Sequence, residues 1–153
     1  RVLHDNGTPR DSFMSHENIH VELQIHWKKW NPSLRFGFEL AKNTAGELLR
    51  SWHDDETPLM PERDFQPGIY HMRATIPGNL LNHGAYSITP LIAEHRRRFI
   101  SRRENVVRFD VSLHLANRDR VNTDRNGIIA PMLDWEIMYQ PDSQRVPSAT
   151  RHS

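Results

Sequence analysis

The sequence contains no cysteine. Disulfide frameworks, zinc ribbons, cysteine nucleophiles and iron–sulfur clusters are therefore excluded. It also lacks a long apolar run, and no stretch approaches the length of a membrane-spanning helix. Neither sign of charge is in excess, because 20 Lys and Arg stand against 19 Asp and Glu. A net charge of +1 gives no argument for a nucleic-acid partner.

The motifs of several common enzyme classes are missing as well. There is no Gly-x-x-x-x-Gly-Lys-Ser/Thr loop, no Gly-x-Ser-x-Gly elbow and no Gly-x-Gly-x-x-Gly turn. Residues 16–20 spell the zinc-protease pattern His-Glu-x-x-His, but that chemistry needs a helix, and the residues from Ile19 onward alternate as in a strand. We therefore expect a protein that is not an enzyme and that has no cofactor and no metal site.

Acidic residues gather in one expected loop. They are Asp54, Asp55, Glu56, Glu62 and Asp64. Two such carboxylates could in principle hydrolyse a glycoside, although acidic loops are usually only solvated. A glycosidase or a metalloenzyme is therefore the third hypothesis for this chain.

What the sequence does contain is strict alternation of apolar and polar residues. The clearest case runs from Ile19 to Trp27, and similar strands are expected over residues 34–40, 69–76, 85–92 and 107–113. Shorter strands are expected at 1–4 and 48–52, and an edge or terminal strand at 128–135. Turn residues separate these segments about every dozen residues, and no helical period is visible.

This pattern predicts an all-β fold, an immunoglobulin-like antiparallel β-sandwich. In immunoglobulin-like order, the strand at Ile19 pairs with the strand at Ile69, and the strands at Leu34, Ala85 and Val106 form the opposite sheet. We expect one domain over residues 1–139 and a disordered tail over 140–153, which has almost nothing to bury. Because the chain starts in what looks like the middle of a strand, we expect it to be a piece of a longer protein.

The stretch from Leu80 to Ile88 predicts how the two sheets are joined. Gly84 can adopt the positive φ that a tight corner needs, and Tyr86 follows it at the start of a strand. A Tyr at such a corner, with its ring in the core and its hydroxyl bonded back to the backbone, is the tyrosine corner of immunoglobulin-like sandwiches. An ordinary glycine turn before a strand with a buried Tyr is the alternative.

The outer face of the sheet at Leu34, Ala85 and Val106 carries the candidate binding surface. Gly37 is expected to leave a bare patch there, surrounded by small hydroxyl and charged side chains. The predicted ligand-binding residues are Arg35, Gly37, Glu39, Ser87, Thr89, Arg108 and Asp110. A shallow polar groove of this kind suits a sugar chain, with Trp30, Trp52 or Tyr139 as an aromatic platform, although an ordinary solvent-facing sheet has the same composition.

Two other surfaces remain open as sites. The outer face of the opposite sheet is a slightly poorer candidate because it lacks a bare centre. Its residues are His20, Glu22, Gln24 and His26 with His71 and Arg73. The segment from Arg96 to Arg103 holds five arginines and reads as a basic turn, which could attract an acidic partner or simply be solvated.

Several short motifs follow one another along the chain between Arg1 and about Trp135. They are Val2-Leu3 with Asp5-Asn6-Gly7, Phe36-Gly37-Phe38, Asn43-Thr44-Ala45-Gly46, Phe65-Gln66-Pro67-Gly68-Ile69-Tyr70, Leu81-Asn82-His83-Gly84-Ala85-Tyr86 and Gly127-Ile128-Ile129-Ala130-Pro131. Together they resemble the C-terminal domain of the ATP-binding subunit of bacterial ABC transporters that export O-antigen polysaccharide, the Wzt type. The chain departs from those subunits in having no ATPase half.

This resemblance implies a non-catalytic carbohydrate-binding module that recognises the exported polysaccharide during lipopolysaccharide biosynthesis. It also implies a homodimer, formed in some members by exchange of a terminal strand. The expected partners are an ATPase domain upstream in the parent chain and the membrane subunit of the transporter, which would place the domain in the cytoplasm, peripheral to the inner membrane. The alternative is a structural or protein-interaction sandwich that docks through the basic turn.

Overall fold

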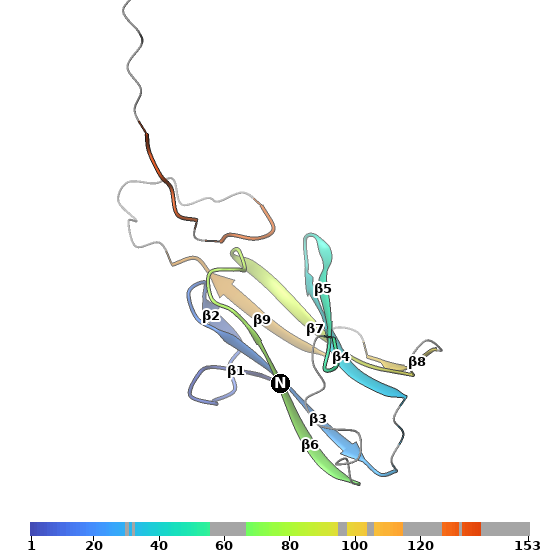
Figure 1. The fold of residues 1–153 in the computed structure, drawn as a ribbon. Coiled ribbons are helices and arrows are strands. Elements are labelled where there is room, and N and C mark those ends of the chain that lie inside the picture. Colours follow the sequence, from blue (N-terminus) through green and yellow to red (C-terminus); the bar gives the residue numbers. More distant parts are fainter. Residues whose placement is uncertain are drawn as a thin grey trace, which may run out of the picture.

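The computed structural model describes residues 1–29, 31, 33–55, 67–94, 98–103, 106–114, 127–131 and 133–138. Within these residues the chain forms nine β-strands and no helix (Figure 1). The strands are β1 (Val2–Leu3), β2 (Ser12–Met14), β3 (Ile19–Trp27), β4 (Leu34–Lys42), β5 (Gly46–Trp52), β6 (Gly68–Ile76), β7 (Gly84–Glu94), β8 (Arg98–Arg102) and β9 (Val107–Ser112). The all-β prediction is confirmed.

The strands form two sheets. The small sheet has the order β1-β3-β6, and the large sheet has the order β2-β9-β7-β4-β5. β8 also pairs with β7, along residues 91–94, whereas β9 pairs with β7 along residues 84–88. The predicted pairing of the strands at Ile19 and Ile69 and the predicted grouping of β4, β7 and β9 are therefore confirmed.

Three details of the sandwich differ from the prediction. β2 was missed because three residues are too few to show alternation, and it pairs in parallel with β9, so the large sheet is mixed rather than purely antiparallel. Residues 98–102 of the basic turn form the strand β8. Over 128–135 the described residues form only an isolated bridge, between Leu81 and Ile129, instead of a strand. The tail predicted at 140–153 lies outside the described residues.

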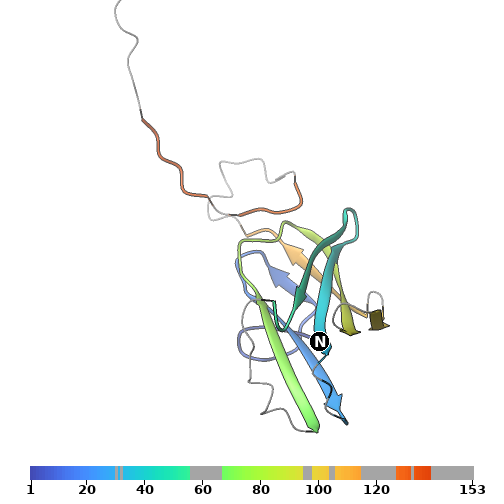
Figure 2. The same ribbon diagram turned by 45° about the vertical axis from the view of Figure 1, so that its right-hand side comes forward.

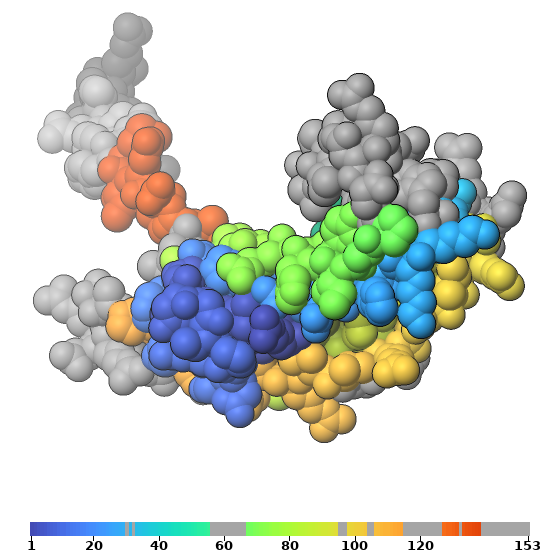
Figure 3. Space-filling view, turned by 90° about the horizontal axis from the view of Figure 1, so that it is seen from below, coloured from blue at the N-terminus to red at the C-terminus, as the bar shows by residue number. Residues whose placement is uncertain are grey.

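The core lies between the two sheets and takes the apolar face of each long strand. Phe13 and Phe109 meet edge to face with ring centroids 5.9 Å apart, and Tyr86 stacks on Phe109 at 5.6 Å. Figure 3, which looks at the molecule from below, shows the N-terminal residues in dark blue between β6 in green and β9 in amber. Since Val2 and Leu3 are 3% and 1% exposed, β1 closes this edge of the core.

The tyrosine corner is present. The hydroxyl of Tyr86 donates a hydrogen bond of 2.7 Å to the carbonyl oxygen of Asn82, and the ring is fully buried. Burial raises the pKa of Tyr86 to about 12. Gly84 has a φ of 140°, as the corner requires. The corner therefore joins the start of β7 to the loop that precedes it.

The C-terminal segment is attached to the same corner and then leaves the sandwich. The side-chain amide of Asn82 donates to the carbonyl oxygen of Gly127 at 2.7 Å, and the amide of Ala130 donates to the carbonyl oxygen of Leu80 at 2.9 Å. Beyond this anchor, residues 133–138 extend away from both sheets in the two ribbon views (Figures 1 and 2). Trp135 is 84% exposed and Ile137 is 92% exposed.

Candidate functional site

The pattern His-Glu-x-x-His at residues 16–20 does not form the helix that a zinc protease needs. β3 already begins at Ile19, and the ring of His16 packs against the ring of His114 with centroids 4.5 Å apart. The carboxylate of Glu17 accepts the amide of Met14 at 2.7 Å, which lowers its pKa. Among the residues that the structure describes, no group of three or more His, Asp or Glu could hold a metal ion.

The described residues contain no helix that is long and apolar enough to cross a membrane.

Three openings in the surface are candidate ligand sites. Two lie between the sheets, at opposite edges of the sandwich, and the third lies on the large sheet.

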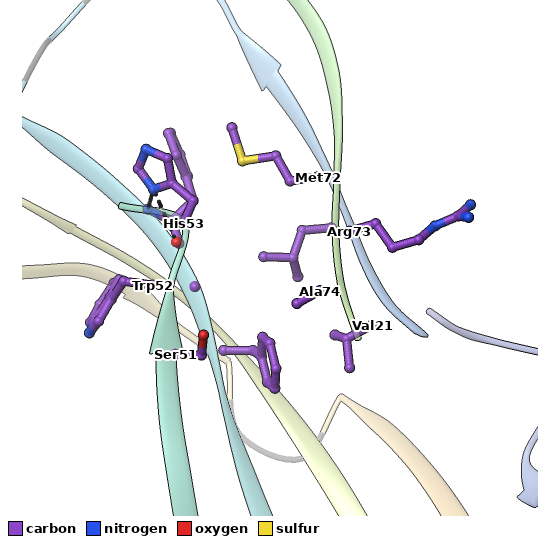
Figure 4. A pocket seen from close by; sticks show the side chains of 11 residues that line it. Val21, Ser51, Trp52, His53, Met72, Arg73 and Ala74 are labelled. Carbon is purple, nitrogen blue, oxygen red and sulfur yellow. Dashed lines mark hydrogen bonds between the residues drawn. The ribbon is translucent and has the colours of Figure 1, made fainter. Parts of the chain in front are cut away.

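The first opening is a cleft between the edge strands β5 and β6 (Figure 4). Figure 4 shows the side chains of His53 and Met72 on its two sides, while Trp52 and Arg73 point away from it on the outer faces of their sheets. Its volume of about 60 Å³ is far below the range of about 300–1,000 Å³ that is typical of ligand pockets. The cleft is too small for a sugar residue.

The second opening lies between β3 and the strands β7 and β9, and has a volume of about 230 Å³. Its walls are mainly apolar and include Leu23, Ile25, Ile88 and Ile92. A sugar needs many hydrogen-bond partners, so these walls do not suit one.

The predicted site residues lie together on the outer face of the large sheet, which is the face turned away from the small sheet. Across the β4–β7 pair, Gly37 lies opposite Leu91, Glu39 opposite Thr89 and Ala41 opposite Ser87. Across the β7–β9 pair, Ser87 lies opposite Arg108 and Ala85 opposite Asp110. The strand register therefore brings the whole predicted set onto one surface.

The prediction of a bare patch at Gly37 is wrong. A Cβ atom at Gly37 would clash with the carbonyl oxygen of Ser51 and lie 2.9 Å from Cε3 of Trp52, so the indole and the neighbouring strand fill this space. Glu39, Ser87 and Thr89 are also buried, with 6%, 2% and 5% exposure. For Glu39 the reason is that Arg50 of β5 and Arg102 of β8 reach over it, which the pattern of β4 and β7 alone cannot show.

An ion-pair network lies over the middle of this face. The carboxylate of Glu39 accepts hydrogen bonds from Arg50 of β5 at 3.0 Å and from Arg102 of β8 at 2.9 Å. Arg50 also contacts Glu47 at 3.0 Å. One buried carboxylate thus holds two cations that come from opposite edges of the sheet.

Beside this network, two aromatic rings form what we call the aromatic platform. Trp52 of β5 and Phe99 of β8 stack with centroids 6.1 Å apart and planes 30° from parallel. Arg35 lies over the indole at 4.9 Å, and Arg50 lies over the Phe99 ring at 5.7 Å. Phe99 is 46% exposed. The platform is therefore a partly exposed apolar surface, and each of its two rings has a guanidinium group over one face.

The guanidinium group of Arg35 is fixed by two carboxylates. It bonds Asp54 at 2.7 Å and Asp55 at 3.0 Å, and Asp55 also accepts the amide of Trp52 at 2.8 Å. These two acids belong to the group considered for glycoside hydrolysis, and the other three members lie outside the described residues. In the structure, Asp54 and Asp55 act as structural partners of the platform.

The third opening, which we call the polar hollow, lies at the other end of the outer face. It has a volume of about 270 Å³ and is lined by Asp11, Asn43, Ala85, Arg108 and Asp110, with Tyr86 and Phe109 beneath. Arg108 and Asp110 are members of the predicted set. A wall of two carboxylates, one amide and one guanidinium group offers both donors and acceptors to a small polar ligand.

Sequence reasoning missed several residues of this face. The sequence gives no signal for Arg50, Phe99 and Arg102, because the arginines around β8 are typical of a turn and the short β5 segment does not show which sheet it joins. Asp11 and Asn43 were missed because they lie in connections, where no alternation marks the side on which a residue falls. Of the three aromatic residues suggested, Trp52 is on the face, whereas Trp30 and Tyr139 lie outside the described residues.

The outer face of the small sheet is held by its own ion pairs. The carboxylate of Glu22 binds Arg1 at 2.7 Å and Arg73 at 3.1 Å, and these contacts lower its pKa to about 2. His20 lies between Asp5 and Thr75, at 2.8 Å from each. Glu22 and His20 are thus engaged with neighbouring side chains of the small sheet.

The basic segment is divided between two surfaces. Arg102 turns onto the outer face of the large sheet, while Arg98 is 77% exposed and lies 3.9 Å from Glu94. Arg103 is exposed, and residues 96 and 97 lie outside the described residues.

Comparison with solved structures now identifies the architecture. The crystal structure of the C-terminal domain of Wzt matches this chain with a TM-score of 0.62, over 90% of this chain and 80% of that chain. This chain has the fold of the Wzt C-terminal domain. The sequence identity is 10%, so the Wzt likeness is one of fold, and it confirms the immunoglobulin-like sandwich. No protein-family profile matches the sequence, and no curated protein sequence matches it.

Proposed function

We propose that this Wzt-like domain is a non-catalytic carbohydrate-binding module, which holds a bacterial surface polysaccharide of the O-antigen type on the outer face of its large sheet. The observation that carries the proposal is the aromatic platform, in which the half-buried Trp52 stacks on the exposed Phe99 on an otherwise polar face. A sugar ring has an apolar face of C–H groups and a rim of hydroxyl groups. Such a ring can rest on the platform while the polar neighbours bond its hydroxyls.

The residues proposed from the sequence divide into three roles on this face. Arg35 borders the platform, and the backbone at Gly37 leaves room for Trp52 to lie against the sheet. Glu39 orients two guanidinium groups toward the bound chain. The remaining residues of the predicted set are Ser87, Thr89, Arg108 and Asp110, which form the floor and the far end of the surface.

Binding is expected to be weak for each contact. The face is open to water, and each hydrogen bond to a ligand is therefore worth only about 0.5–1.5 kcal/mol net. Affinity then comes from several sugar residues along one chain or from more than one domain per assembly. In the proposed setting, the domain follows an ATPase domain in a longer parent chain and works with the membrane subunit of an exporter, on the cytoplasmic side of the inner membrane.

The test is a titration with oligosaccharides from the surface polysaccharide of the bacterium that encodes the chain. We expect saturable amide shifts in ¹H–¹⁵N spectra near Trp52 and Phe99, and we expect Phe99→Ala to weaken binding. Ile69→Ala is the matched control, because Ile69 is 59% exposed on the small sheet, away from the platform. Equal binding by both variants, or no shifts from folded protein, would refute the proposal.

We also propose that the module is a homodimer. Leu133, Trp135 and Ile137 alternate with Asp134 and Glu136, yet the three apolar side chains are 65%, 84% and 92% exposed. A second copy that pairs with this segment would remove them from water, as in exchange of a terminal strand. Light scattering should give twice the chain mass, and the double variant Trp135→Ser, Ile137→Ser should give a monomer. A wild-type monomer at high micromolar concentration would contradict this.

The alternative function is docking of an acidic protein on the basic segment. The exposed Arg98 and Arg103 favour it, although Arg102 is engaged with Glu39. Docking between charged surfaces weakens steeply with ionic strength, whereas binding of a neutral glycan barely changes. Titrations at low and high salt, with Arg103→Ala as a probe, separate the two functions.

A further inference from the structure

The polar hollow differs from the rest of the outer face in the state of its side chains. Within the described part of the chain, the side chains of Asp11, Asn43, Arg108 and Asp110 make no hydrogen bond or ion pair, whereas Arg35, Arg50 and Arg102 are all paired with carboxylates. The hollow therefore presents donors and acceptors that are available to a ligand. We propose that it is a second subsite, which takes one uncharged sugar residue of the glycan.

The walls of the hollow are held in place by the backbone. The amide of Asn43 donates to the carbonyl oxygen of Ala85 at 3.0 Å, and the amide of Asp110 donates to the carbonyl oxygen of Asp11 at 2.8 Å. Each of the two connections is thus tied to a strand of the large sheet. Because these bonds already fix the backbone at the rim, a ligand needs to order only the side chains.

The floor of the hollow contains the small side chain of Ala85. Ala85 lies opposite Asp110 of β9, and its carbonyl oxygen accepts the amide of Asn43 on the other side. The volume of about 270 Å³ is close to the lower end of the range for ligand pockets, so it suits a single sugar residue rather than a longer stretch of polymer.

The charge of the hollow disfavours an anionic ligand. Asp11 and Asp110 carry two negative charges and Arg108 one positive charge, so the walls have a formal net charge of −1 and oppose a uronate or a phosphate. Carboxylates accept hydrogen bonds from hydroxyl groups, a guanidinium group donates to them, and the Asn43 amide does both. Neighbouring hydroxyls of a neutral sugar offer this mixture of donors and acceptors.

The inference rests on the proposed function and extends it along the sheet. The platform lies at the level of Leu91 on β7, and the hollow lies at the level of Ala85. At about 3.3 Å per residue, these levels are about 20 Å apart. A polysaccharide chain that occupies both sites therefore follows β7, with the paired arginines beneath its middle.

The first experiment uses methyl glycosides as probes. Methyl glycosides of a neutral hexose, a 6-deoxyhexose, an N-acetylhexosamine and a hexuronic acid are titrated separately, at millimolar concentrations, into the ¹⁵N-labelled domain. We expect saturable shifts of the Ala85, Arg108 and Asp110 amides with at least one neutral glycoside and none with the hexuronide. The inference would be overturned if only the hexuronide shifts these amides, or if none of the four glycosides does.

The second experiment separates this subsite from the proposed function. Asn43→Ala should weaken binding of the surface oligosaccharide about two- to tenfold, and Asp110→Ala by about tenfold or more, as expected for the loss of a neutral and a charged hydrogen-bonding group. Ala85→Ile should block the hollow by steric filling in a conformation that a strand accepts. Lys28→Ala, at an exposed charged position just after β3 of the small sheet, is the control.

The pattern of losses decides between the two ideas. If Phe99→Ala weakens binding while the three hollow variants bind as the wild type does, the subsite is wrong and the glycan-binding face stands. If Phe99→Ala and all three hollow variants bind as the wild type does, both are wrong. Amide spectra of each variant show whether the fold is intact, and Ala85→Ile keeps all the charges of the hollow.

Discussion

Glu39 is expected to be the residue on which the outer face depends most. Its carboxylate is 7% exposed and binds both Arg50 and Arg102, whose side chains are 34% and 41% exposed. The substitution Glu39→Gln keeps the size of the side chain and removes its charge. The new amide can accept one hydrogen bond, but its NH₂ group then faces the other guanidinium group.

The expected cost lies between two limits. Removing one member of a fully buried ion pair costs about 3–5 kcal/mol, and an exposed pair is worth about 0.2–1 kcal/mol. Both arginines here keep part of their hydration, so we expect a loss of about 2 kcal/mol. For a chain of this length, 1 kcal/mol shifts the Tm by about 2–4 °C, which gives a fall of about 4–8 °C.

The assay is thermal unfolding of the two variants Glu39→Gln and Glu47→Gln. Glu47 is a matched control, because it binds the same Arg50 at the same 3.0 Å while its side chain is 43% exposed. Its substitution should lower the Tm by less than about 2 °C. Equal shifts for the two variants would show that the arginines are solvated regardless of Glu39, and would refute the reasoning from burial.

Two further predictions concern the corner and the small sheet. Tyr86→Phe should cost about 1–3 kcal/mol in the free energy of unfolding, because the buried hydrogen bond from the Tyr86 hydroxyl to the Asn82 carbonyl oxygen is lost. Urea titration measures this cost, and an unchanged midpoint would show that the bond does not stabilise the fold. The pKa of Glu22 is lowered from 4.5 to about 2 by Arg1 and Arg73, so its contribution to stability is present above pH 4.5 and is lost as the pH falls toward 2. Between pH 4.5 and 2, the Tm of Glu22→Gln should fall less with decreasing pH than the Tm of the wild type. Parallel curves of Tm against pH for the two proteins would contradict this.

Much of the architecture could be read from short-range patterns. Alternation along Ile19–Trp27 marks a strand with one buried face, since successive side chains in a strand point to opposite sides. Gly84 followed by Tyr86 marks the corner, because positive φ and a buried hydroxyl are properties of single residues and their near neighbours. These features need no knowledge of what lies opposite.

The candidate site could be predicted only in outline. Arg35, Gly37 and Glu39 were assigned to the correct face of β4, because the face follows from counting residues. Counting residues cannot show whether that face is open to solvent or covered by other side chains. The space above Gly37 is taken by Trp52, which follows it by fifteen positions in the chain.

The sequence by itself therefore determined the long strands, their division into two sheets and the face on which each of their residues falls, because these depend on local periodicity. Only the tertiary structure decided which side chains meet on that face. Phe99 reaches Trp52 across β7 and β4, and Asp11 and Asn43 meet at Ala85 from two separate connections. Such contacts depend on strand register and on the path of loops, and no period in the chain encodes either of them.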